Sequence, residues 1–518
     1  MPQNASRRND TPRVMLVGAG PGDPGLLTLR GCECLNQADV VLYDGLSNTD
    51  ILIHAVNAQK ICVGKHGQSR IWKQHEIIDE MLRHARSGRR VVRLKGGDPA
   101  VFARTSEEVD ALVAAGIEFE IVPGITAALA AGSYAGIPIT HRGIASAVAL
   151  VTGHEQPGKT SSDLDWRALA AFPGTLVIYM GVTTARTWTK ALIDHGKDPS
   201  TPCAIIRRCS LNDQQTRHCR LDEVADHLTP ATKLRPPVIT IVGPVTDLAE
   251  HMDWFSKRPL LGKRVLISRP QVVMESPSQS DDVLSSQLCS LGAVVLSQPV
   301  MSIVAEEPSI LDATLDRIDA FDWIVFSSRN GVRYLTQRIC QRGGDARSLG
   351  QVRIAAVGTG TAEELWRFRL RADLLPTTST GSNLAAALAT HARHARVLSI
   401  RGNRGGDHFR RPLEDAGHSL EEVVVYKQVD GPETSPEVQT AIDERALDWI
   451  TITSGELARR LHDRFGDALW QIRIAAISPA VRSVLQSLGG RDIVVAESPG
   501  MDSIIDAIID AESHQAVG

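Results

Sequence analysis

This chain is short of aromatic residues, has no surplus of positive charge and carries no long apolar run. Aromatic residues make up 4% of its 518 residues, and 56 Lys and Arg against 60 Asp and Glu leave a formal net charge of −4. Nucleic acid is not expected as the main partner, because no basic excess exists to neutralise its phosphates. A membrane partner is not expected either, since no apolar run approaches the ~20 residues that span a bilayer.

The Cys-x-x-Cys motif is missing as well. The eight cysteines are spread out, with no Cys-x-x-Cys among them: Cys32, Cys34, Cys62, Cys203, Cys209, Cys219, Cys289 and Cys340. This usage fits a reducing cytoplasm better than a disulfide scaffold, so we expect a cytoplasmic protein. The Cys and His residues between positions 203 and 219 lack the short spacings of zinc ligands, and we expect no metal. Residues 1–12 are polar and predict a disordered start, neither a signal peptide nor an anchor.

The chain has instead a regular alternation of short apolar runs and helical patterns. This alternation is typical of an α/β protein with mostly parallel sheets and helices on their faces. In the first half the predicted strands are 14–17, 40–43, 90–94, 118–122, 147–152, 175–180, 203–206 and 238–242. In the second half they are 264–268, 294–296, 323–327, 352–357, 397–401, 420–426, 449–453, 472–477 and 492–495.

A domain boundary is predicted at residues 253–262. This segment ends one helical pattern, contains Pro259 and precedes a fresh strand. We therefore expect one domain over residues 13–258 and another over 259–518. Within the second, Pro299 and the polar stretch 427–437 predict two crossings between lobes, with one lobe made of 261–299 plus 428–515 and the other of 300–427.

The first strand leads into a glycine-rich turn, Gly18-Ala-Gly20-Pro21-Gly22-Asp23. It is not the dinucleotide-binding fingerprint, because Asp23 stands where that motif needs its third glycine. Pro21 also removes a backbone N–H where a pyrophosphate would need a donor. The turn therefore predicts a cofactor loop of another kind.

Further clusters of polar residues and glycines follow other strands of the first half. They are Asp44 with Gly45, Gly64-Lys65-His66, Gly96-Gly97-Asp98-Pro99 running on to Arg104, and Pro123-Gly124-Ile-Thr126 followed by Thr140-His141-Arg142. Singly, each is best interpreted as a tight turn. Because open α/β sheets bind ligands at the carboxyl ends of their strands, the whole set favours a ligand cleft.

In this order, the clusters resemble the uroporphyrinogen-III C-methyltransferases of the tetrapyrrole methyltransferase family, over about residues 13–255. The resemblance implies a two-lobed methyltransferase fold, S-adenosylmethionine as donor (leaving S-adenosylhomocysteine), an anionic tetrapyrrole as substrate, and a homodimer formed through this half. The cofactor-contact positions that it carries over are Pro21, Gly96, Gly97, Asp98, Val101, Thr126, Ala127, Met180 and Cys209.

The same resemblance implies roles in proton transfer and substrate binding. Asp44 matches the proton acceptor and Lys65 the proton donor, although a lysine there could instead clamp a substrate carboxylate. The positions near the substrate are Arg104, Glu107, Glu108, His141 and Arg142. The chain departs from the family at Gly45, where arginine is common, at Thr105-Ser106, where two glycines are common, and at Cys209, where glycine is typical.

The second half repeats a strand followed by a Ser- or Thr-rich helix start. Each such turn alone is best interpreted as ordinary N-capping. Together, three of these segments resemble uroporphyrinogen-III synthase, over about residues 261–515. They are Phe-Ser327-Ser328-Arg-Asn-Gly, Ala-Val-Gly-Thr-Gly-Thr361-Ala and Val-Val-Tyr426-Lys. The resemblance implies a bilobal α/β fold without metal or organic cofactor, Tyr426 assisting loss of the substrate hydroxyl, and substrate contacts at Ser327, Ser328, Thr361 and Ser454. From the residues alone, Tyr426 could equally be a tyrosine at the edge of the core.

The two resemblances predict a bifunctional enzyme. Its second half would cyclise hydroxymethylbilane to uroporphyrinogen III, and its first half would methylate that product twice to precorrin-2, on the path to sirohaem or cobalamin. One alternative is a methyltransferase for a later corrin intermediate with an inert synthase half. Another is a non-catalytic tetrapyrrole-binding protein. The intact Asp44 and Lys65 argue against this last reading. Gly45, Cys209 and Ala480, which stands where the synthase family often has threonine, keep it open.

Overall fold

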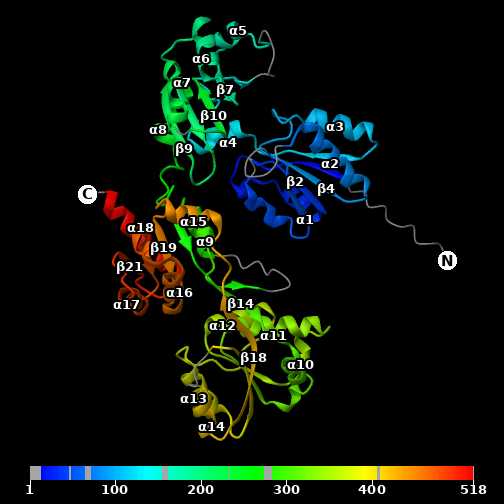
Figure 1. The fold of residues 1–518 in the computed structure, drawn as a ribbon, viewed down its shortest axis with the longest axis vertical. Helices are drawn as coiled ribbons and strands as arrows, with labels where there is room; N and C mark the ends of the chain where they lie inside the picture. The colour runs from blue at the N-terminus through cyan, green and yellow to red at the C-terminus, as the bar shows by residue number, and fades with distance from the viewer. Residues whose placement is uncertain are drawn as a thin grey trace, which may run out of the picture. The chain divides into compact units, whose positions relative to one another are not determined.

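The computed structural model describes residues 13–45, 48–64, 72–154, 162–232, 234–273, 283–404 and 409–516. The chain divides into two compact units, residues 1–262 with 291–294 and residues 263–290 with 295–518 (Figure 1). The predicted α/β class is confirmed, since each unit contains two sheets with helices between their strands. The disordered start predicted for residues 1–12 lies outside the described residues. Within the described part of the chain, no helix is both long and apolar enough to cross a membrane.

The first sheet of unit 1 is parallel and covered on both faces. Its strands β1 (Val14–Gly18), β2 (Val40–Tyr43), β3 (Gln59–Cys62), β4 (Val91–Lys95) and β5 (Phe119–Val122) lie in the order β3-β2-β4-β1-β5. Helices α1 (Leu29–Gln37), α2 (Gln74–Arg86), α3 (Thr105–Ala114) and α4 (Ala127–Tyr134) come between or after them. Met15 and Val17 belong to the core on one face and Val14 and Leu16 to the core on the other. This double burial explains why β1 is an unbroken apolar run.

The second sheet of unit 1 is mixed. Its strands β6 (Val148–Thr152), β7 (Thr175–Tyr179), β8 (Pro202–Arg207), β9 (Gln215–Arg220) and β10 (Val238–Val242) lie in the order β6-β7-β10-β8-β9. The helices of this part are α5 (Trp166–Ala170), α6 (Ala185–Asp194), α7 (Val224–His227) and α8 (Ala249–Met252). Strand β9 was not predicted, because it is an edge strand of mostly exposed polar residues with no apolar alternation.

One sheet of unit 2 has the order β13-β11-β19-β20-β21. It consists of β11 (Arg264–Ile267), β13 (Val294–Ser297), β19 (Trp449–Ile452), β20 (Arg473–Ala476) and β21 (Ile493–Val495). The helices of this part are α9 (Val283–Ser290), α15 (Pro436–Asp443), α16 (Gly455–Phe465), α17 (Pro479–Ser487) and α18 (Met501–Ala516). Its strands and the helices α15, α16 and α17 share one apolar core that includes Leu266, Ile450 and Leu461.

The other sheet of unit 2 has the order β12-β14-β18-β17-β15-β16. It consists of β12 (Gln271–Val272), β14 (Met301–Ala305), β15 (Trp323–Phe326), β16 (Arg353–Ala356), β17 (Arg396–Gly402) and β18 (Ser419–Asp430). Helices α10 (Ser309–Leu315), α11 (Arg329–Gln341), α12 (Thr359–Arg367), α13 (Gly381–His391) and α14 (Arg410–Asp415) belong to it. Strand β18 runs three residues past the crossing predicted after residue 427, because its end pairs antiparallel with β14, Met301 opposite Asp430.

Candidate functional site

Two strand-end turns of the first sheet in unit 1 are hydrogen-bonded to each other. The N–H of Gly20 donates to the carbonyl of Gly97 at 3.1 Å, and the N–H of Gly97 donates back to the carbonyl of Gly20 at 2.8 Å. A third turn joins them through Asp98, whose Oδ2 accepts from the N–H of Gly124 at 3.0 Å. The turns after β1, β4 and β5 therefore form one connected wall.

Glycine is required where these three turns cross. A Cβ at position 124 would stand 2.2 Å from the carbonyl oxygen of Gly97 and 2.8 Å from the Cα of Gly18. A Cβ at position 18 would stand 2.6 Å from the Cα of Gly124. Both clashes are with backbone atoms, so no rotamer change can relieve them.

The connected wall bounds a cavity of about 470 Å³. All nine residues predicted to contact the cofactor line it: Pro21, Gly96, Gly97, Asp98, Val101, Thr126, Ala127, Met180 and Cys209. Other parts of its lining were missed from the sequence, chiefly Phe102, His154, Tyr179, Thr183 and the stretch 236–239. Of these, Tyr179 had a usable signal, because it ends a strand and directly precedes Met180. The cavity draws residues from both sheets of unit 1.

Tyr179 ties the second sheet to the start of α4. Its hydroxyl lies 2.7 Å from Thr126 Oγ1 and accepts from the N–H of Ala128 at 2.9 Å. Burial raises the pKa of this phenol, so it stays protonated and can donate to the threonine. Phe102 and Met180, which also line the cavity, have the left-handed φ values of 52° and 54° that non-glycine residues rarely adopt. Such strained backbone is concentrated at binding sites.

Cys209 brings a thiol into the lining. It is buried, and its Sγ lies 4.0 Å from the carbonyl oxygen of Ala127. Burial raises the pKa of the thiol to about 12, so it remains protonated near neutral pH. A protonated buried thiol acts as a small apolar group, neither a nucleophile nor a metal ligand.

Asp44 lies directly after β2, next to the end of β4. Its Oδ1 accepts from Arg93 Nη2 at 2.6 Å, and its side chain is 30% exposed. The predicted partner Lys65 lies outside the described residues.

Glu108, one of the positions predicted near the substrate, is fully buried, and a contact with substrate stays a prediction. Its side chain is 0% exposed, and its carboxylate accepts from Arg93 Nε at 3.2 Å and from Lys95 Nζ at 2.6 Å. Glu107 instead faces outward, in a two-pronged ion pair with Arg104 at 2.7 Å for each bond. His141 and Arg142 are exposed as well. Substrate binding by these four residues stays a prediction.

In unit 2 the predicted serines cap helices. Ser328 accepts from the N–H of Gly331 at the start of α11, and Ser454 accepts from the N–H of Leu457 at the start of α16. N-capping thus accounts for part of the Ser pattern, as each turn alone suggested. Ser327 and Ser454 are exposed, whereas Thr361 is buried in the first turn of α12. Contacts between these residues and a substrate remain predictions.

Tyr426 is held between Ser328 and Tyr334. Its hydroxyl lies 3.0 Å from Ser328 Oγ, and its ring stacks on Tyr334 with centroids 5.8 Å apart. Gly402 leaves room for this ring, because a Cβ there would stand 2.5 Å from its Cζ. The tyrosine is therefore a buried member of the apolar core, held beside the serine cap of α11, and its catalytic role stays a prediction.

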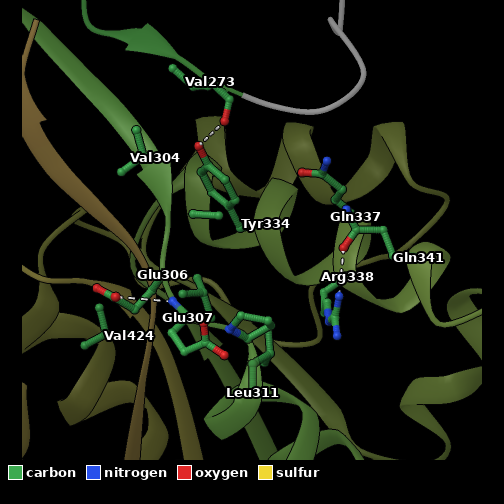
Figure 2. Close-up of a pocket in the computed structure, with 13 residues that line it drawn as sticks. Val273, Val304, Glu306, Glu307, Leu311, Tyr334, Gln337, Arg338, Gln341 and Val424 are labelled. Atoms are coloured by element: carbon green, nitrogen blue, oxygen red, sulfur yellow. Dashed lines mark hydrogen bonds between the residues drawn. The ribbon is translucent and has the colours of Figure 1, made fainter.

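A second cavity, of about 380 Å³, lies beside Tyr334 (Figure 2). It is bounded by β14, α10, α11 and β18, and its lining includes Glu306, Glu307, Gln337 and Leu311. The Tyr334 hydroxyl donates hydrogen bonds to the carbonyl oxygens of Ile303, at 2.8 Å, and Val273, at 2.9 Å. Figure 2 shows it pointing toward Val273. None of the residues predicted from the sequence lines this cavity.

Comparison with known proteins agrees with this division of the chain. Residues 13–225 match the family "Tetrapyrrole (Corrin/Porphyrin) Methylases", and residues 282–506 match "Uroporphyrinogen-III synthase HemD". A "Porphyrin biosynthesis protein HemD" of Ruminiclostridium josui is 32% identical over 501 residues, which are 96% of this chain and 97% of that protein.

Two further similarities concern the first half alone. An "S-adenosyl-L-methionine-dependent uroporphyrinogen III methyltransferase" of Methanosarcina barkeri is 48% identical over 237 residues, 46% of this chain and 92% of the relative. A solved uroporphyrin-III C-methyl transferase from Thermus thermophilus, complexed with S-adenyl homocysteine, is 44% identical. The match covers 46% of this chain and 99% of that one, with a TM-score of 0.40.

Proposed function

Because the chain belongs to the family that joins a tetrapyrrole methylase to a HemD-type uroporphyrinogen-III synthase, we propose that it carries out both reactions in sequence. Unit 2 cyclises hydroxymethylbilane to uroporphyrinogen III. Unit 1 then transfers two methyl groups from S-adenosylmethionine to give precorrin-2. The product of one unit is the substrate of the other.

One observation carries the methyl-transfer half of this proposal. Nine residues chosen from sequence as cofactor contacts, spread from position 21 to position 209, line a single cavity. The cavity also suits the ligand, because it combines apolar walls with glycine backbone at Gly96 and Gly97 and a hydroxyl at Thr126. Apolar pockets with a few placed polar groups are typical of cofactor sites.

The methyl-transfer chemistry asks mainly for positioning. When bound, S-adenosylmethionine would supply a methyl group on its sulfonium. An electron-rich pyrrole carbon would attack that methyl group in line, with the thioether sulfur as the leaving group. The connected turns around Gly97 and Gly124 hold the methyl donor. The carboxylate of Asp44 accepts the proton that the tetrapyrrole loses afterwards. Arg104 and Arg142 pair with substrate carboxylates, for which guanidinium groups are well shaped.

For the synthase half, Tyr426 assists departure of the hydroxyl of hydroxymethylbilane. The contact between Tyr426 and Ser328 at 3.0 Å supports this role, since it orients the phenol beside the helix start. Ser327, Thr361 and Ser454 contact the substrate. We propose no metal for either reaction, and a homodimer formed through unit 1.

The whole chain, given hydroxymethylbilane and methyl-labelled S-adenosylmethionine with a chelator present, should form precorrin-2 carrying two labelled methyl groups. Without the donor it should stop at uroporphyrinogen III. Absorbance and mass spectra identify the products, and sedimentation of the same sample gives the oligomeric state. Closure only to the non-inverted uroporphyrinogen isomer would contradict the synthase assignment. Supplied uroporphyrinogen III that gains no methyl group would contradict the methyltransferase assignment.

Replacing Gly402 by alanine should separate the two activities. The new Cβ would displace the Tyr426 ring, from which it is 2.5 Å away, and break the contact with Ser328. Misplacing a catalytic group by about 1 Å can cost on the order of 100-fold, so we expect the cyclisation rate to fall at least about tenfold. Methylation of supplied uroporphyrinogen III by the same variant is the internal control and should stay at the wild-type rate.

A further inference from the structure

The carboxylate of Asp44 is held by an arginine from the interior of the sheet. Arg93 lies on β4 and its side chain is 4% exposed. One of its nitrogens, Nη1, donates to the carbonyls of Leu94 at 3.1 Å and Leu42 at 3.4 Å. This leaves Nη2 aimed at Asp44 Oδ1, which it reaches at 2.6 Å. The guanidinium thus has one fixed orientation, set by backbone carbonyls of β2 and β4.

Glu108 fixes the other side of the same guanidinium. Its Oε1 accepts from Arg93 Nε and from Gln74 Nε2, both at 3.2 Å, and its Oε2 accepts from Lys95 Nζ. The cluster therefore has equal numbers of positive and negative groups. The cations are Arg93 and Lys95, and the carboxylates are Glu108 and Asp44. Three of the four are buried, and only Asp44 reaches the surface.

Stability alone is a weak reason to keep such a group of charges. Burying ions costs several kcal/mol each, and apolar residues of similar size often stabilise a protein as well or better. The arrangement also treats the two oxygens of Asp44 differently. Oδ1 is bound to Arg93, whereas Oδ2 makes no hydrogen bond to any residue that the structure describes. Among the described residues, one oxygen of Asp44 is anchored and the other has no hydrogen-bond partner.

We propose that Arg93 is a positioning residue for methyl transfer: it fixes the Asp44 carboxylate, ionised and in one orientation, and Glu108 holds Arg93 in place. In the step it serves, the C–CH₃ bond forms as the S–CH₃ bond breaks, and the ring proton then passes to the second oxygen of Asp44. The inference rests on the proposed role of Asp44 as proton acceptor.

The competing interpretation is purely structural, because the same contacts join β2, β4, α3 and α2. It predicts different behaviour. Lys95 directly precedes Gly96, which lines the cofactor cavity, so a merely structural role would make Arg93 variants lose cofactor binding and thermal stability together with activity. A positioning role would reduce the methyl-transfer rate while cofactor binding is retained.

The test uses the full chain with Arg93→Lys, Arg93→Gln and the double variant Arg93→Gln/Glu108→Gln. The double variant removes one buried charge of each sign, so it keeps a folded protein to measure if the single change does not fold. Arg186→Gln is the matched control, because that arginine is 81% exposed and lies on α6, outside the first sheet. Each variant is measured for thermal stability, for S-adenosylmethionine binding by calorimetry, and for methylation of supplied uroporphyrinogen III.

We expect Arg93→Gln and the double variant to methylate about 30-fold more slowly, with donor affinity within twofold of wild type. Arg93→Lys keeps the charge but cannot make all the contacts of the guanidinium, so its methylation rate should fall about tenfold.

A wild-type rate in the folded double variant would overturn the inference, as would a loss of rate that only follows a loss of donor binding. Asp44→Asn is measured beside these variants. If Asp44→Asn is impaired and the Arg93 variants are not, the positioning role fails and the proton-acceptor role stands. If Asp44→Asn is fully active, the proposed role of Asp44 itself fails.

Discussion

We expect an alanine at position 124 to weaken binding of S-adenosylmethionine by about 10- to 100-fold. The added Cβ would lie 2.2 Å from the carbonyl oxygen of Gly97, and both that atom and the Cα of Gly18 belong to backbone. The turns must therefore move apart, which breaks the hydrogen bonds between Gly20 and Gly97 and opens the wall of the cavity. Overpacking of this kind costs about 1–3 kcal/mol or more, and about 1.4 kcal/mol corresponds to a factor of ten.

Calorimetric titration with the donor measures this loss. Gly500→Ala is the matched control, because a Cβ there meets no atom within 4 Å. The Gly124→Ala variant should keep its cyclisation activity, since the residues proposed for that reaction lie in unit 2. Donor affinity close to that of the wild type would show that the three turns can separate without cost.

The second large effect is expected from Asp44→Asn. An amide of nearly the same size cannot accept the ring proton, and general-base groups contribute about 100- to 10,000-fold to such steps. We therefore expect methylation of uroporphyrinogen III to fall by at least about 100-fold, with donor affinity unchanged, because Asp44 does not line the cofactor cavity.

Single-turnover kinetics with labelled donor give the rate directly, and whole-chain reactions should then accumulate uroporphyrinogen III. Asp226→Asn, an exposed carboxylate paired with Arg186, is the control. A rate within about threefold of the wild type would exclude Asp44 as the proton acceptor and leave that role to another group.

The strands that could be predicted from the sequence are the buried ones, because their residues form apolar runs. Strands β2 and β10 begin and end at the predicted residues, because each is a buried apolar run between clear turn signals. Strand β9 was missed for the opposite reason, since its residues face solvent at an edge. Strand β14 was missed because its antiparallel partner, the end of β18, lies more than a hundred residues away in the chain.

The candidate site was predictable where the residue type itself indicates the backbone conformation. Glycine, proline and aspartate at strand ends predicted a ligand cleft, because these residues mark close approaches and sharp turns, whereas the family resemblance supplied the nine cavity residues. Side-chain burial was not predictable in the same way. Glu107 and Glu108 are neighbours of the same type, and only the packing of α3 on β4 decides that Glu108 points inward to Arg93 and Lys95.

The crossing of Gly18, Gly97 and Gly124 also bears on the entropy of binding. A loop that is ordered only when its ligand arrives loses conformational freedom at that moment and weakens affinity accordingly. Here the turns are already joined by Gly20, Gly97 and Asp98 through backbone and carboxylate hydrogen bonds. The wall is thus preorganised, its ordering is part of folding, and the interaction energy gained on donor binding is not spent on assembling it.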